Sequence, residues 1–165
     1  MKNILKRYVI LVSIFMLLVA KANAQISKAE IRATGLTCSM CSNAINKQLK
    51  SLPEVVNVKT DLNTNTFTVT LREGNTLNPK VFKDKVEKAG FFIGSLILTT
   101  KSEISNQNAY ILVNNAPKST TEIQIQVLDK GYVTEKEFKK LVKSYTNVTT
   151  YALINEDDFH IKIVN

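Results

Sequence analysis

Between positions 28 and 98 the apolar residues recur first with the period of a strand and then with that of a helix, and this change is repeated. The order of these segments restricts the possible folds more than any other feature of the sequence. Residues 28–34 have the composition of a short strand. A helical pattern follows, with apolar residues at Cys41, Ile45, Leu49 and Leu52. Residues 55–62 and 66–71 then alternate with period two, as half-buried strands do. This part of the chain therefore predicts a strand, a helix and a hairpin in that order.

A second helix and a last strand complete the order. Asn78 and Pro79 are typical of a helix start, because Asn caps free N–H groups and Pro fits the first helical position. Gly90 is expected to end that helix, and residues 91–98 form the last predicted strand. The order β-α-β-β-α-β predicts a ferredoxin-like α+β sandwich over residues 28–98, an antiparallel sheet with two helices on one face.

Both cysteines of the chain, Cys38 and Cys41, fall between the first strand and the first helix. The spacing lets one sulfur from the loop and one from the first helical turn converge on an ion, and the helix N-terminus favours thiolates. Thiolates select soft ions. Zn(II) usually takes four ligands, and no Asp or Glu occurs from Ile31 to Pro53. Cys38 and Cys41 are therefore candidate ligands of one Cu(I) or, second, one Hg(II); Zn(II) stays an alternative.

The same CxxC allows a second interpretation, thiol–disulfide exchange. Thioredoxin-type enzymes also place CxxC at a helix N-terminus. The sequence TCSMCS lacks the aromatic and Gly-Pro residues typical of those enzymes. We therefore favour metal binding without enzymatic activity and keep the oxidoreductase as the alternative. Met40 is a minor candidate ligand, and His160 is expected to be an ordinary side chain of a predicted strand.

The segments GLTCSMC, PEVVNVKTDL and VEKAGFF, in this order, resemble the heavy-metal-associated domain family. The resemblance implies a metal-binding protein that passes its ion to or from a metal-transporting membrane protein or another thiol protein. It also implies that Phe91 shields the metal loop; the alternative is that Phe91 is a core residue of the last strand. Leu36 stands where the family usually has a buried methionine, so we expect this replacement to cost little folding stability.

Residues 1–24 have the three-part layout of a secretory signal peptide. Basic residues precede an apolar run at 8–20, and Ala22 and Ala24 are the small residues that a signal peptidase needs. Cleavage is expected between Ala24 and Gln25, and the protein is predicted to be exported to a periplasm; an uncleaved anchor is the alternative. The peptide carries four basic residues and no acidic one, so its removal lowers the net charge from +8 to +4. A charge this mild and dispersed argues against a nucleic-acid surface.

The remainder of the chain is expected to consist of a polar linker at 99–108 and a smaller ββαββ domain at 109–165. This second domain has predicted strands at 109–113 and 122–128, a helix at 134–145 and a hairpin of 148–154 with 159–164. The strand at 109–113 is expected to pair antiparallel with 122–128. We expect the whole protein to be a monomer or a weak dimer.

A shift of 92 residues places seven apolar residues of the first domain on apolar residues of the second without a gap. Ile31 falls on Ile123, for example, and Phe67 on Phe159. The match predicts a degenerate half-repeat of the first domain. Cys38 falls on Lys130 under this shift and Cys41 on Val133, so the second copy is expected to bind no metal in this way.

Overall fold

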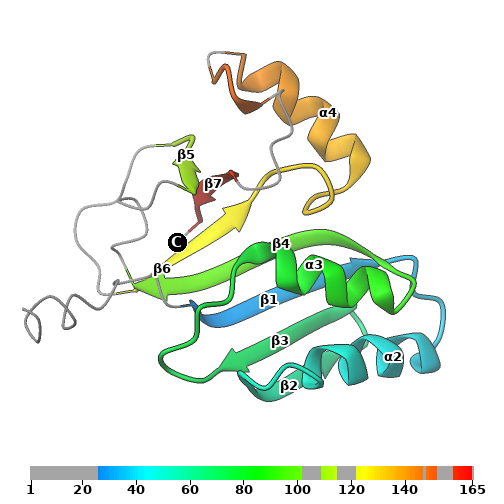
Figure 1. Cartoon of the computed structure of the whole chain (residues 1–165). Helices are drawn as coiled ribbons and strands as arrows, with labels where there is room; N and C mark the ends of the chain where they lie inside the picture. The colour runs from blue at the N-terminus through cyan, green and yellow to red at the C-terminus, as the bar shows by residue number, and fades with distance from the viewer. Residues whose placement is uncertain (1–25, 102–108, 115–121, 147, 152–157, 165) are drawn as a thin grey trace, which may run out of the picture.

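The computed structural model describes residues 26–101, 109–114, 122–146, 148–151 and 158–164. The strands among them form one seven-stranded sheet in the order β2-β3-β1-β4-β6-β7-β5 (Figure 1). The predicted signal peptide at 1–24 lies outside the described residues. Within the described ranges, no helix is long and apolar enough to cross a membrane.

The first half of the sheet has the predicted β-α-β-β-α-β order. Its elements are β1 (Ile26–Thr34), α2 (Ser39–Lys50), β2 (Val55–Asp61), β3 (Thr66–Leu71), α3 (Pro79–Lys88) and β4 (Phe92–Lys101). Strand β1 pairs antiparallel with β3 and β4, and β2 pairs antiparallel with β3. Helices α2 and α3 lie side by side over one face (Figure 1). The predicted ferredoxin-like α+β fold is confirmed.

The period-two residues of the strands and one stripe of each helix make the main core of this half. The fully buried side chains include Ile31, Phe67, Leu96, Leu98, Ile45, Leu49 and Phe82. Helix α2 begins at Ser39, earlier than the apolar pattern indicates, because the side chains of Ser39 and Met40 are exposed and carry no apolar signal. Gly90, at a φ of +87°, follows the end of α3 as predicted.

The C-terminal half continues the same sheet. Its elements are β5 (Tyr110–Leu112), β6 (Glu122–Val127), α4 (Glu135–Ser144) and β7 (Phe159–Ile163). Strand β6 pairs antiparallel with the stretch of β4 from Leu96 to Lys101. The first three residues of the predicted linker are therefore strand, and its remainder at 102–108 lies outside the described residues. Because β4 is paired on both edges, the sheet is continuous across the predicted boundary between the two halves.

The prediction that residues 109–113 pair antiparallel with 122–128 is wrong. Strand β5 pairs in parallel with β7 instead, with Ile111 opposite His160. Both edges of β6 are already taken, one by β4 and the other by β7. The segment therefore forms the far edge of the sheet, beyond β7.

The predicted half-repeat holds only in outline. Strand β6, helix α4 and strand β7 follow in the expected order, and β6 pairs antiparallel with β7 as β1 does with β3. In the first half Ile31 lies opposite Phe67, so the gapless shift would place Ile123 opposite Phe159. The observed register instead places Ile125 opposite Ile163. Residues 148–151 form turns rather than the predicted strand, and 152–154 lie outside the described residues.

We expect Leu96→Ala to lower the free energy of unfolding by about 2–5 kcal/mol, because Leu96 is fully buried in the strand shared by both halves. Urea unfolding measures the loss. Val56→Ala is the control, because Val56 is 61% exposed on the edge strand β2. This substitution should lower the free energy of unfolding by no more than about 0.5 kcal/mol. A cost at Leu96 as small as that at Val56 would contradict the central place of β4.

Candidate metal centre

The end of β1 positions the loop that carries both cysteines. Thr34 lies opposite Phe92 in the β1–β4 ladder, and its hydroxyl donates a hydrogen bond of 3.3 Å to the Phe92 carbonyl. Gly35 follows at a φ of +85°, a left-handed conformation that side chains disfavour, and turns the chain out of the strand. Leu36 is half-buried and packs against the main core, as expected for the methionine position of the family. The loop is thus anchored on the core just before the first cysteine.

The structure brings the two predicted site residues together. Cys38 is the N-cap of α2 with extended backbone angles, and Cys41 is the third residue of the helix. Their Sγ atoms lie 2.8 Å apart and both thiols are free. The Cys41 backbone N–H donates a 3.1 Å bond to the Cys38 carbonyl, which fixes the first turn between them. Cys38 is exposed and Cys41 half-buried, so the pair of thiols is accessible from solvent.

Helix α2 begins without a side-chain cap, in contrast to α3 and α4. The Asn78 side chain caps α3 by accepting a bond from the Val81 N–H, and Thr134 caps α4 by accepting from the Glu137 N–H at 3.3 Å. Neither a capping side chain nor an acidic residue in the first turn occupies the start of α2. Its free N–H groups and the positive end of its dipole therefore act on the thiols.

Hydrogen bonds hold the pKa of the Cys41 thiol below its ordinary value. The side chain of Cys38 contributes most, and a backbone bond from Thr37 comes next. Partial burial opposes them by raising the pKa. The thiolate of Cys41 therefore forms at a lower pH than that of an ordinary cysteine, so fewer protons compete with a metal ion at neutral pH.

Two neighbouring side chains differ in their relation to this loop. Met40 is 79% exposed, as expected for a residue between the two candidate ligands. Phe91 precedes β4, is half-buried and packs against the main core. Its Cδ1 atom lies 3.9 Å from the place that a Cβ on Gly35 would take. Phe91 thus contributes to the core, and its ring lies near Gly35 at the start of the loop. The shielding of a metal by Phe91 stays a prediction.

His160 belongs to strand β7, as predicted. It is 2% exposed, with Nδ1 2.7 Å from Asp129 Oδ1 and Nε2 2.9 Å from Thr150 Oγ1. Both ring nitrogens thus have protein partners, which is the arrangement of a buried structural histidine. The sequence pattern did not indicate Asp129 or Thr150, because both partners come from irregular segments. In the described ranges, no three His, Cys, Asp or Glu side chains gather as a metal-binding group.

Residues 30–92 match the family model of the heavy-metal-associated domain. This part of the chain belongs to that family. The match begins within β1 and ends at the first residue of β4, so it spans the metal loop and both helices that cover the sheet. The family resemblance of the motif and its neighbouring segments is confirmed.

Several solved structures are similar to part of this chain. The yeast copper transporter domain Ccc2a is 34% identical; the match covers 39% of this chain and 86% of that one, with a TM-score of 0.36. The N-terminal domain of a potential copper-translocating P-type ATPase from Bacillus subtilis, Cu(I)-loaded, is 30% identical, with 41% and 82% covered and a TM-score of 0.36. The CopZ metallochaperone is 19% identical, with 41% and 98% covered and a TM-score of 0.37. TM-scores this low add no argument to the family match, and no curated protein matches the chain.

We expect the pKa of Cys41 to depend on a donor at position 38. Cys38→Ala removes the largest contribution to the lowered pKa, so the midpoint of Cys41 alkylation should move to higher pH. Cys38→Ser retains a hydrogen-bond donor and should keep a midpoint below that of Cys38→Ala. The rate of iodoacetamide alkylation, followed from about pH 5 to about pH 10, a range that brackets the ordinary cysteine pKa, measures both. Equal midpoints in the two variants would contradict the account.

Proposed function

We propose that this protein binds one soft metal ion between Cys38 and Cys41 and exchanges it with other thiol-containing proteins. The observation that carries the proposal is the pair of free thiols, 2.8 Å apart, at the uncapped start of α2 in a heavy-metal-associated domain. The two sulfurs must move apart to admit an ion between them, and the Cys38 side chain is exposed to solvent.

Cu(I) is the proposed ion. Two thiolates satisfy an ion that is soft and accepts few ligands, and thiolates select Cu(I). Zn(II) usually takes four protein ligands at a structural site, and the loop and helix from Ile31 to Pro53 contain no carboxylate to supply them. Hg(II) shares the softness and the low ligand number of Cu(I), so it is the second choice.

Transfer by ligand exchange is the proposed mechanism. Cys38 is exposed and Met40 beside it is largely exposed, so a partner's thiolates can approach the ion from solvent. Each sulfur–metal bond formed by the partner replaces one bond to Cys38 or Cys41, and no electrons change hands. The positive end of α2 stabilises the anionic metal–dithiolate unit before a partner binds. The proposed partners are a metal-transporting membrane protein or another thiol protein.

Export to a periplasm is part of the proposal. Its support is the N-terminal sequence alone, with a basic start, an apolar run and Ala22 and Ala24 before the expected cleavage point. In an oxidising compartment the two thiols are at risk of forming a disulfide, which removes both ligands. A reducing partner would then be needed for metal binding.

We expect the reduced protein to take up one equivalent of Cu(I) in an anaerobic titration against a competing chelator. Cys38→Ser and Cys41→Ser should each weaken the affinity by at least about 100-fold, more than the 10–100-fold typical of losing an outer-shell partner. Met40→Leu is the matched control, because it changes an exposed sulfur in the same loop and should leave the affinity unchanged.

Undiminished Cu(I) uptake in Cys38→Ser would overturn the proposal. Efficient turnover of the wild-type protein in an insulin-reduction assay would favour the alternative, a thiol–disulfide oxidoreductase. The same titration with Hg(II) and Zn(II) ranks the ions by affinity.

A further inference from the structure

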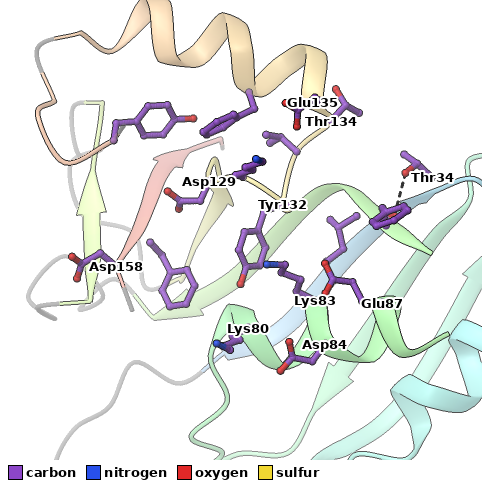
Figure 2. Close-up of a pocket in the computed structure, with 18 residues that line it drawn as sticks. Thr34, Lys80, Lys83, Asp84, Glu87, Asp129, Tyr132, Thr134, Glu135 and Asp158 are labelled. Carbon is purple, nitrogen blue, oxygen red and sulfur yellow. Dashed lines mark hydrogen bonds between the residues drawn. The ribbon is translucent and has the colours of Figure 1, made fainter. Parts of the chain in front are cut away.

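A cleft of about 720 Å³ lies between helix α3 and the C-terminal half (Figure 2). One wall is the outward side of α3 from Lys80 to Glu87, and the other is the segment from Asp129 to Glu135. Its volume lies within the range of about 300–1,000 Å³ that is usual for ligand sites, which often occur where two parts of a chain meet. The family-matched region at 30–92 supplies only the first wall, so the cleft depends on the part of the chain that follows it.

The second wall is held firmly against the first half. Val133 forms a bridge with Ser95 of β4, and a Cβ on Gly94 would lie 3.6 Å from the Thr134 methyl group. Lys83 crosses from α3 to the opposite wall, with its Nζ 5.7 Å from the centre of the Tyr132 ring (Figure 2). Strand pairing, close packing and a cation–π contact thus fix the width of the cleft.

The cleft is long enough for a short extended peptide, and its lining includes Thr34, the last residue of β1 before the loop with the cysteines. Lys80 and Glu87 are seven residues apart on α3, which is about 10 Å along a helix and about three residues of extended chain. At the end nearest Glu87 the lining includes Thr34 and Phe92. The next residue after Thr34 is Gly35, which begins the loop that carries Cys38. An occupant of the cleft would therefore be held close to the two cysteines.

The lining combines aromatic side chains with an excess of negative charge. Tyr132, Phe138, Tyr151, Phe159 and Phe92 contribute rings, and five carboxylates stand against three lysines, a net of −2. Asp129 is engaged by His160, and Lys83 by the Tyr132 ring. Asp84 and Glu87 are exposed on α3, and in the described part of the chain neither forms an ion pair. Four of these rings are buried, whereas Phe92 is 68% exposed. The cleft thus offers two available carboxylates and, at one end, one exposed aromatic ring.

We propose that this cleft binds an extended segment of a partner protein that carries a Lys or Arg next to an apolar side chain. The basic group faces Asp84 and Glu87, and the apolar side chain packs against the exposed ring of Phe92. The partner's docked segment is then beside the metal loop. That this partner also exchanges metal with Cys38 and Cys41 rests on the proposed function. The binding of the segment to the cleft does not.

The test uses the full chain with Cys38→Ser and Cys41→Ser, so that the result does not depend on metal binding. The probe is the tripeptide acetyl-Lys-Phe-Lys-amide, and its charge-reversed control is acetyl-Glu-Phe-Glu-amide. Amide chemical shifts in a ¹⁵N NMR titration should move for Glu87, Tyr132 and Glu135 with the basic peptide alone. Raising NaCl from about 0.05 M to about 0.5 M should weaken the binding, because salt screens exposed charges.

Two exposed substitutions locate the contact without disturbing the core. Glu87→Gln should weaken binding of the basic peptide about threefold, in the range of an exposed charge pair, and Phe92→Ser should also weaken it. Glu73→Gln is the matched control, because Glu73 is an exposed carboxylate outside the cleft and should leave the affinity unchanged.

Each contrary outcome overturns the proposal. No shift in the cleft up to millimolar peptide would exclude binding, and equal affinity for the acidic peptide would exclude the charge argument. Unchanged affinity in both Glu87→Gln and Phe92→Ser would place the contact elsewhere. Equal affinity for arginine amide alone would show that the cleft takes a small cation rather than a polypeptide segment.

Discussion

The candidate site depends on the connection between β1 and α2, because the fixed end of β1 determines where the two cysteines lie. Strand β1 is paired on both edges, by β3 and β4, so the position and direction of its last residue are fixed. Gly35 then turns the chain, and Leu36 anchors it on the core. As a result, Cys38 falls at the N-cap of α2 and Cys41 one turn further. The two sulfurs converge because the paired strand β1 and the packed Leu36 position the loop that carries them.

The C-terminal half extends the sheet rather than repeating the site. At the start of α4, Thr134 accepts a backbone hydrogen bond and the first turn carries Glu135 and Glu137, so the positive end of that helix is already satisfied. The start of α2 has neither a capping side chain nor an acidic residue in its first turn, and the two thiols lie there instead. The pairing of β6 with β4 also covers an edge that would otherwise be free, and it places a second wall across from α3.

The features that the sequence predicted are those determined locally. Each predicted feature lies within a few residues of the structure that it specifies. These features are the changes of period between 28 and 98, the helix caps Asn78 and Thr134, and the end of α3 at Gly90. The approach of Cys38 and Cys41 follows from the same local order. Strand pairing is different, because alternation shows which residues are buried but not which strand lies beside them. Nothing in the sequence near Tyr110–Leu112 indicates a parallel pairing with β7. The cleft, the Lys83–Tyr132 contact and the Asp129–His160 pair likewise join segments far apart in the chain, so the sequence alone did not indicate them.

The central claim is that two cysteine sulfurs, and no other side chains, hold the ion. X-ray absorption at the copper edge of the Cu(I)-loaded protein tests it most directly, since it identifies the atoms bound to the metal. The account predicts a first shell of two sulfur atoms that disappears in the Cys38→Ser, Cys41→Ser double variant and is unchanged in Met40→Leu. A first shell that contains nitrogen from His160, or that survives loss of both cysteines, would contradict it.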